Sequence, residues 1–271
     1  MYEILRREKL TPNVNLFEVN APAIANKAEP GQFIILRVCE EGERFPITIA
    51  DTDPDDGTVT IIFAEVGKSS KLLGRMDVSE KILNFAGPLG NPTKIENYGD
   101  VLCIGGGVFL GALLYQIRAL KELGNQIYSI IGARNIDHLF WIDKFEEVSE
   151  ETWIATDDGS KGYEGIEFLY DLLKKYEFDQ VITMGPTSMQ KMVSEATKPY
   201  NIPTTVNLFP IMVDGTGMCG SCRVTVGGET LFACVDGPDF DGHKVDFDEL
   251  ISRMRYYNQN EKIAMVLLQE D

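Results

Sequence analysis

The chain has 271 residues, with 42 acidic and 25 basic side chains and a formal charge of −17 at pH 7. This acidic balance argues against nucleic acid or an anionic membrane as a partner, because both are bound through Lys and Arg. A composition of 44% hydrophobic and 25% charged residues is typical of a folded globular protein. No apolar run approaches the ~20 residues of a membrane helix, and the charged start MYEILRREKL is not a signal peptide, so we expect a cytoplasmic protein.

Residues 1–96 are predicted to form a small antiparallel β-barrel or sandwich. Apolar, β-branched runs at 31–38, 45–51 and 59–67 are separated by turn-forming Pro, Asp and Gly residues. Short strands with this spacing are typical of closed β-structures. A single helix is predicted at 71–76, where it would cover an open end of the barrel.

From residue 97 the pattern changes to apolar strands that alternate with helices. This alternation indicates an α/β domain over 97–212 with a parallel sheet covered on both faces. Its strands are predicted at 101–106, 126–134, 152–156, 180–186 and 203–208, and its helices at 110–123, 137–147, 164–176 and 187–198. Residues 213–271 form a third unit, with a Gly- and Cys-rich loop followed by one helix over 246–266.

Three of the five cysteines lie within 16 residues of one another. The spacing D-x4-C-x2-C-x11-C runs from Asp214 through Cys219 and Cys222 to Cys234. It is similar to the C-x4-C-x2-C…C spacing of plant-type [2Fe–2S] loops, with Asp in the first position. The glycines between these residues suit a loop with positive φ angles that directs N–H groups toward sulfur. A zinc site or a chance C-x-x-C is the alternative, and His243 is a rival ligand.

Three further segments have the composition of phosphate-binding sites. The glycines at 105–107 end a strand and precede a helix, as in a pyrophosphate turn. The segment 44–48 (RFPIT) combines a cation, a Pro-stiffened strand and a hydroxyl, and 67–70 (GKSS) adds a glycine, a cation and two hydroxyls. The alternative for the last two is an exposed strand edge and an ordinary helix N-cap.

Together these motifs resemble the ferredoxin–NADP reductase superfamily. Within it, the chain is similar to the electron-transfer subunits of dihydroorotate dehydrogenase and to the small (alpha) subunits of NADH-dependent reduced ferredoxin:NADP oxidoreductase, or sulfide dehydrogenase. The similarity covers nearly the whole chain and is most specific at 44–51, 155–165, 212–228 and 232–250. It implies an oxidoreductase subunit that moves electrons between NAD(H), FAD, a [2Fe–2S] cluster and a larger flavoprotein subunit with FAD and [4Fe–4S] clusters.

The resemblance also implies a set of site residues. The FAD residues would be Arg44, Phe45, Pro46, Thr48, Gly67, Ser69 and Ser70. The NAD(H) residues would be Gly105, Gly106, Gly107, Arg134, Asp157 and Asp158. The cluster ligands would be Asp214, Cys219, Cys222 and Cys234, because the family that the chain resembles also has Asp as the first ligand.

Particular roles follow from the same resemblance. Arg44 would pair with the FAD phosphates, Pro46 would line the flavin ring, and Thr48 would hydrogen-bond near flavin N5. Ser69 and Ser70 would hold the pyrophosphate from the other side. Ferredoxin would meet the larger subunit, because this chain and ferredoxins are both acidic.

Two departures from the family pattern lie in the α/β segment. Phe109 and Leu110 stand where relatives have small residues, and Met184-Gly185-Pro186 replaces Cys-Gly-Pro. Bulky side chains at the turn are expected to crowd a dinucleotide. One alternative is therefore a related subunit that has lost NAD specificity and uses another donor, such as a sulfur compound. A non-enzymatic zinc-binding module is the second alternative.

Overall fold

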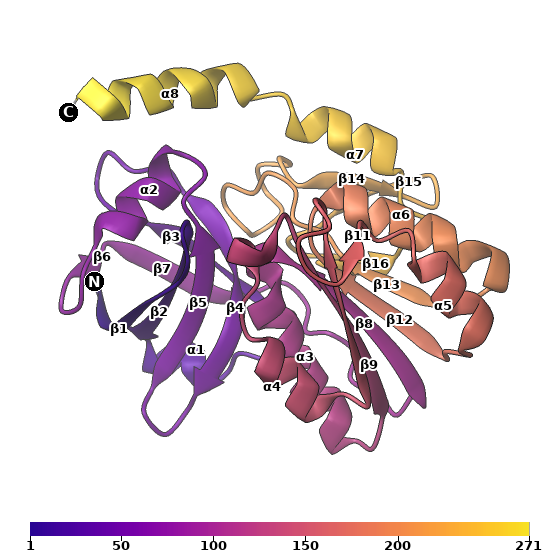
Figure 1. Cartoon of the computed structure of the whole chain (residues 1–271). Coiled ribbons are helices and arrows are strands. Elements are labelled where there is room, and N and C mark those ends of the chain that lie inside the picture. Colours follow the sequence, from indigo (N-terminus) through magenta and orange to yellow (C-terminus); the bar gives the residue numbers. More distant parts are fainter. Residues whose placement is uncertain (271) are drawn as a thin grey trace.

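Two seven-stranded sheets form the framework of the computed structural model, which describes residues 1–270 (Figure 1). The first is a curled antiparallel sheet in the order β6-β1-β2-β5-β4-β3-β7. Its strands are β1 (Tyr2–Thr11), β2 (Val14–Asn20), β3 (Phe33–Arg37), β4 (Phe45–Asp53), β5 (Thr58–Ala64), β6 (Lys81–Ile82) and β7 (Asn84–Leu89). The short helix α1 (Pro22–Ala25) and helix α2 (Lys68–Arg75) lie in its connections. The predicted N-terminal antiparallel barrel is confirmed.

The second sheet has the order β11-β10-β9-β8-β12-β13-β16, and all its neighbours are parallel except β13 and β16. Its strands are β8 (Asp100–Gly106), β9 (Gln126–Ala133), β10 (Glu151–Thr156), β11 (Tyr163–Glu164), β12 (Gln180–Met184), β13 (Thr204–Asn207) and β16 (Asp239–Asp241). Strand β12 is buried along its whole length, as expected where helices cover both faces. The predicted α/β domain is confirmed.

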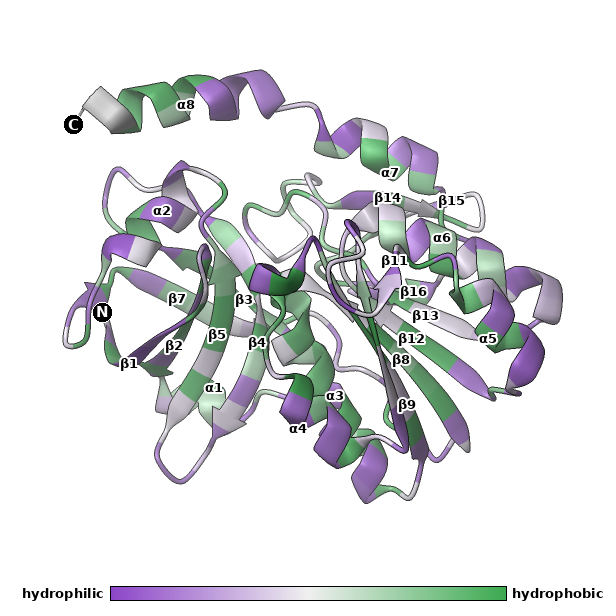
Figure 2. Ribbon diagram, viewed as in Figure 1, coloured by the Kyte–Doolittle hydropathy of each residue, from purple (hydrophilic) through white to green (hydrophobic). Residues whose placement is uncertain are grey.

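Helices cover the two faces of this second sheet. They are α3 (Leu110–Glu122), α4 (Ile142–Val148), α5 (Leu169–Lys175) and α6 (Thr187–Thr197), with single 3-10 turns at Gly107–Phe109, Ile136–His138 and Lys198–Tyr200. Helices α3 and α4 lie on the side that faces the barrel, and α5 and α6 lie on the other side (Figure 1). Figure 2 shows hydrophobic residues along β8 and β12 and hydrophilic residues on α5.

The barrel and the second sheet share one hydrophobic core at α3. Ala50 and Ile62 of the barrel belong to the same buried cluster as Leu110 and Leu113 of α3. Gly111 allows this close approach, because a Cβ there would lie 2.5 Å from Ile62 Cδ1 and 2.9 Å from Ala50 Cβ. The two domains are therefore fixed against each other by side-chain packing.

Residues 213–271, predicted as a third unit, pack against the barrel and the second sheet and do not form a separate domain. It contains the hairpin β14 (Arg223–Val226) and β15 (Glu229–Phe232), then β16, which completes the edge of the second sheet. The single helix predicted over 246–266 is wrong: α7 (Phe247–Met254) and α8 (Asn258–Glu270) are separate. Residue 271, the end of the predicted third unit, lies outside the described residues. Among the residues described, no helix has the length and apolar character of a membrane span.

Helix α8 reaches back across the molecule. It lies alongside α2 of the barrel, whereas α7 packs on α6 of the second sheet (Figure 1). An ion pair of 2.6 Å between Lys191 of α6 and Asp248 of α7 accompanies the second contact. The C-terminal helices thus connect the outer parts of both domains above the loop at 213–222.

Candidate cofactor sites

The loop at 213–222 has the backbone that cluster binding requires. Gly215, Gly217 and Gly220 have φ values of +71°, +82° and +67°. Residues that carry a side chain rarely adopt this left-handed backbone conformation, so glycine is needed at these turns. Gly215 also lies against the barrel, since a Cβ there would be 2.7 Å from Leu89 Cδ1. The loop is therefore tightly turned and supported from below by β7.

The three cysteines differ in exposure. Cys222 and Cys234 are 1% and 2% exposed, with their sulfurs 3.2 Å apart, whereas Cys219 is exposed. Burial, and then the neighbouring Cys222, raises the pKa of Cys234 to about 12, although the backbone N–H of Gly217 donates to its sulfur. Without metal this thiol is protonated, so cluster binding would displace its proton.

Cys219 has a different electrostatic environment. Burial alone would raise its pKa, but hydrogen bonds from the hydroxyl and backbone N–H of Ser221 outweigh this and lower the pKa of the thiol. Backbone N–H groups thus point at the sulfurs of both Cys219 and Cys234. Such N–H···S bonds are a normal feature of iron–sulfur sites. The donor set and the loop conformation therefore fit an iron–sulfur cluster.

Asp214 organises the loop. One of its carboxylate oxygens accepts from the Thr216 N–H at 2.8 Å, and the other accepts from the Cys219 N–H at 2.7 Å. The bond from Thr216, followed by that from Cys219, lowers the pKa of this carboxyl against the effect of burial. Each oxygen keeps a second lone pair, so ligation by Asp214 stays a prediction.

The four predicted ligands do not converge on one point. Within the described part of the chain, no three His, Cys, Asp or Glu side chains are grouped at metal-binding range. The structure brings Cys222 and Cys234 together and places Asp214 and Cys219 on the adjacent loop. His243, the rival ligand, instead places its Nε2 2.9 Å from the Thr197 hydroxyl.

The predicted flavin residues Pro46 and Thr48 share one face of β4. Phe45, Ile47 and Ile49 of this strand pack into the barrel core, so Pro46 and Thr48 point to the opposite face. Arg44 directly precedes the strand. Phe45, which was predicted with them, therefore turns its ring away from that face. Thr48 is 7% exposed, and its hydroxyl has no hydrogen-bond partner within the described residues. A buried hydroxyl without a partner costs about 1–3 kcal/mol, and a bound flavin would supply one.

The N-terminus of α2 lies close to this strand. Ser69 donates a long hydrogen bond of 3.4 Å to Glu43, which directly precedes Arg44. The Ser70 hydroxyl accepts from the N–H groups of Val66 and Gly67 at 3.0 Å, so it caps the helix. The side chain of Ser70 is thus occupied, and the first-turn N–H groups and Arg44 are the better candidates for a pyrophosphate. These residues fit the phosphate end of a dinucleotide.

The strand order of the second sheet reverses between β8 and β12, and the carboxyl ends of these two strands are the switch point of the sheet. Ligands of parallel sheets bind at such points. Gly106 ends β8 and Gly185 follows β12, and a Cβ on either would lie 3.3 Å from the sulfur of Met189. Met189 belongs to the first turn of α6. Its thioether therefore covers Gly106 and Gly185, a contact that the sequence did not indicate.

The predicted crowding by Phe109 and Leu110 is wrong. Leu110 is fully buried in the core between the domains. The Phe109 ring packs edge-to-face on Phe209, with ring centroids 5.7 Å apart. Gly105 serves the same packing, because a Cβ there would be 2.6 Å from Leu113 Cδ2, whereas Gly107 has φ +59° and open space around it. Of the three glycines, Gly106 and Gly107 lie at the switch point and are not used in this packing.

The remaining predicted nucleotide residues lie along the same edge of the sheet. Arg134 follows β9, and Asp157 and Asp158 follow β10, so all three are at carboxyl ends of neighbouring parallel strands. All three are exposed. Hydrogen bonds from Ser160 lower the pKa of Asp158. The structure thus places them at the carboxyl ends of β9 and β10, on the side of β8 that is away from β12.

An antiparallel barrel, a mainly parallel sheet with a switch point between β8 and β12, and a cysteine loop beside both define the class of ferredoxin reductase-like electron-transfer proteins. Residues 210–246 match the model described as the iron–sulfur cluster binding domain of dihydroorotate dehydrogenase B. A Thermotoga maritima protein named dihydroorotate dehydrogenase B (NAD(+)), electron transfer subunit homolog, is 44% identical over 97% of this chain and 93% of that protein. A probable subunit of the same name from Methanocaldococcus jannaschii is 35% identical over 81% of each chain.

The chain therefore belongs to the dihydroorotate dehydrogenase B electron transfer subunit family. A solved structure of NADH-dependent reduced ferredoxin-NADP oxidoreductase, described in terms of flavin-based electron bifurcation, matches 99% of this chain and 98% of that chain at 43% identity, with a TM-score of 0.94. Phthalate dioxygenase reductase, at 16% identity and a TM-score of 0.62, shares the fold. The predicted family, its oxidoreductase class and its flavin and iron–sulfur chemistry are confirmed by these matches.

His243 provides a prediction about acid stability. Burial, which outweighs the opposing charge of Asp241 and acts with that of Lys198, lowers the pKa of its imidazole. In the unfolded chain this imidazole has its ordinary pKa of about 6.5, so the unfolded chain binds more protons. The stabilisation is therefore present above that value and is lost as pH falls through the lowered pKa. We expect His243→Gln to lose less unfolding free energy than the wild type between pH 7.5 and 5, measured by urea titration. Equal losses would contradict this assignment.

Proposed function

We propose that this chain is the electron-transfer subunit of a cytoplasmic oxidoreductase, with FAD on the β4 face and a [2Fe–2S] cluster in the 214–234 segment. One observation carries the proposal. Thr48, the buried hydroxyl without a partner, is paired across the strands with Phe33 of β3. Phe33 lies in the same buried cluster as Cys222 and Cys234. The hydroxyl proposed to bind the flavin is thus next to the same buried cluster of side chains that contains the two thiols.

The residues of this chain would bind and orient the flavin. FAD, when bound, supplies the exchange between two-electron and one-electron carriers, which no side chain can perform. Thr48 offers its hydroxyl, Pro46 offers an apolar surface on the same strand face, and Arg44 offers a cation that has no partner among the described residues. The N–H groups at the start of α2 add favourable electrostatics for phosphate.

The two-electron partner is proposed to be NAD(H). Gly106 and Gly107 give the backbone access that a pyrophosphate needs, and Arg134, Asp157 and Asp158 lie along the same sheet edge. The side chain of Met189 must move away from Gly106 and Gly185 before NAD(H) can bind there. Its unbranched thioether can do so at low cost, because methionine has several accessible rotamers.

Onward transfer is proposed to a larger flavoprotein subunit with FAD and [4Fe–4S] clusters, with ferredoxin meeting that subunit. The close structural relative is named for NADH, ferredoxin and NADP together, which supports this arrangement. A second candidate is a subunit that has lost NAD specificity. It is favoured by Met189, which covers Gly106 and Gly185, and by Met184, which is fully buried at the position of the cysteine in the Cys-Gly-Pro pattern.

Anaerobic titration of the purified protein with NADH tests the proposal. We expect an initial spectrum with flavin and iron–sulfur absorbance, followed by bleaching at a stoichiometry of about one NADH per FAD. A coloured protein that NADH does not reduce would favour the second candidate. A colourless zinc protein would exclude both.

Thr48→Val tests the flavin anchor. In protein stripped of FAD, the change should leave the urea-unfolding free energy unchanged or higher, because the hydroxyl has no partner to lose. FAD affinity should fall about tenfold, the value of one hydrogen bond of ~1.4 kcal/mol. Thr183→Val is the matched control, since its buried hydroxyl on β12 also has no partner in the described residues. An equal effect of both changes on FAD affinity would argue against the anchor.

Asp214→Cys tests the fourth ligand. The variant should keep its iron. The midpoint potential of the cluster should fall toward that of all-cysteine plant-type clusters, which is about −400 mV, because thiolate donates more charge than carboxylate. The readouts are redox titration and the electron paramagnetic resonance spectrum. Asp236→Cys is the control, because Asp236 also accepts a backbone N–H in this segment, from Phe232 at 2.7 Å. An unchanged potential in Asp214→Cys would remove Asp214 from the ligand set.

A further inference from the structure

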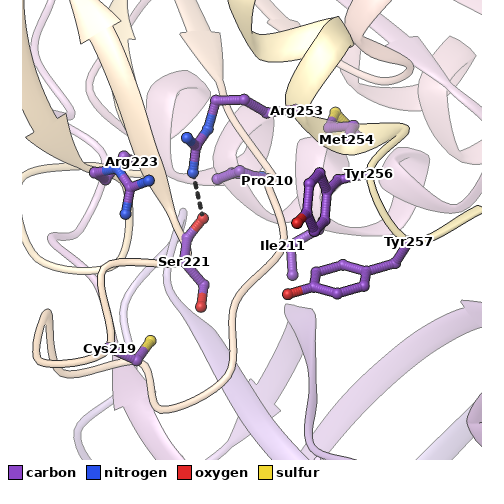
Figure 3. A pocket seen from close by; sticks show the side chains of 9 residues that line it. All are labelled: Pro210, Ile211, Cys219, Ser221, Arg223, Arg253, Met254, Tyr256 and Tyr257. Atoms are coloured by element: carbon purple, nitrogen blue, oxygen red, sulfur yellow. Dashed lines mark hydrogen bonds between the residues drawn. The ribbon is translucent and has the colours of Figure 1, made fainter.

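The tight turn at 219–222 is held by two arginines that bond to its carbonyl groups. Arg223, the first residue of β14, donates to the carbonyl of Gly220 at 2.7 Å. Arg253, in the last turn of α7, donates to the carbonyl of Ser221 at 3.3 Å, beside an open cavity of about 430 Å³ (Figure 3). Arg223 directly follows the turn in the chain, whereas Arg253 comes from a separate helix. Helix α7 thus fixes the turn from outside.

Ser221 connects this arginine to a predicted cluster ligand. Its hydroxyl and its backbone N–H both donate to the sulfur of Cys219, while its carbonyl accepts from Arg253. The N–H and the carbonyl of one residue are separated by only two rotatable backbone bonds. A guanidinium that fixes the carbonyl therefore also restricts the direction of the two donors that reach the sulfur.

The charged groups around the turn have different partners. The carboxylate of Asp214 accepts from two backbone N–H groups of its own loop, and that of Asp236 accepts from the N–H of Phe232. Among the residues that the structure describes, the arginines that form ion pairs are Arg6, Arg7, Arg37 and Arg118. The surroundings of the turn are thus of mixed charge. Arg253 is distinguished by its contact with Ser221 and by being half-buried, whereas Arg223 is exposed.

We propose that Arg253 is a positioning residue of the iron–sulfur site, which holds the two donors of Ser221 on the Cys219 sulfur and so raises the midpoint potential of the cluster. The inference rests on the proposed function, which places a cluster at this turn. Reduction adds one electron, and therefore one negative charge, without making or breaking a bond. Donors aimed at a sulfur stabilise that charge, since hydrogen bonds to the sulfurs are among the factors that set cluster potentials.

Geometry and charge make different predictions for Arg253. A guanidinium that acted through its charge alone would have the same effect whether or not the Ser221 hydroxyl is present, and salt would weaken the effect. One that acts through Ser221 loses part of its effect when that hydroxyl is removed, because residues that share one contact have non-additive effects. A double-mutant cycle therefore separates the two cases.

The experiment is an anaerobic redox titration of the cluster in the holoprotein, followed by electron paramagnetic resonance. Arg253→Met keeps an apolar stem and removes the donor and the charge. At a fixed potential it should lower the ratio of reduced to oxidised cluster about tenfold, which is 59 mV for a one-electron couple. Arg253→Lys keeps a cation with donors and should lower the ratio by less than about threefold. Arg255→Met is the matched control, because it removes the same charge from an exposed residue just after α7 and should leave the ratio unchanged.

Ser221→Ala completes the cycle. It removes the hydroxyl donor but keeps the carbonyl that Arg253 contacts, and it should also lower the ratio. The double variant Arg253→Met/Ser221→Ala should lower it by less than the product of the two single effects, equally at about 50 and about 500 mM salt. Arg253→Gln takes the place of Arg253→Met in the cycle if the latter does not keep its iron.

Three results would overturn the positioning role. They are single effects that multiply in the double variant, an unchanged potential in Ser221→Ala, and an effect of Arg255→Met as large as that of Arg253→Met. A wild-type protein without iron would instead overturn the proposed function, and metal analysis would reveal this before any titration.

Discussion

The site depends on one hydrophobic cluster to which all three segments of the chain contribute. Phe33 and Ile35 come from the barrel, Val206 and Leu208 from the second sheet, and Cys222 from the cysteine loop. Because protein interiors are packed as densely as organic crystals, none of these segments can shift without disturbing the other two. The β4 face, one strand away, is held at a fixed position relative to the buried thiols by this packing. The proposed positions of the flavin and the cluster are thereby held at a fixed distance by side-chain packing.

A network of hydrogen bonds centred on Asp239 lies beside the hydrophobic cluster. The carboxylate of Asp239 accepts from the Thr93 hydroxyl and from the Asn207 amide, both at 2.6 Å. Thr93 in turn accepts from Gln116 of α3 at 2.7 Å. Burial raises the pKa of Asp239, and the two donors oppose this effect. The network links the segment between the domains to α3, β13 and β16, and since hydrogen bonds require specific geometry, it selects one relative arrangement of the packed parts.

The sequence predicted the features whose causes are local. The apolar, β-branched run at 45–51 predicted the strand that carries Pro46 and Thr48, and the glycines predicted the turns between Asp214 and Cys222. Features that depend on packing between segments were not predictable in the same way. Phe109 was read as an obstacle because its partner, Phe209, is 100 residues away in the chain. Met189 was not recognised, since only the fold brings the first turn of α6 over Gly106 and Gly185. The break between α7 and α8 has a similar origin, because each helix packs on a different domain.

One feature that is unfavourable for stability coincides with the proposed flavin site. The buried hydroxyl of Thr48 has no partner within the described residues, which opposes folding by about 1–3 kcal/mol. The proposed flavin would remove this cost. The left-handed backbone at Gly215, Gly217 and Gly220 has no such cost, because glycine adopts positive φ readily. Binding that favours the folded state adds to its stability, so a chain of this design should be most stable when its cofactors and partner are all present.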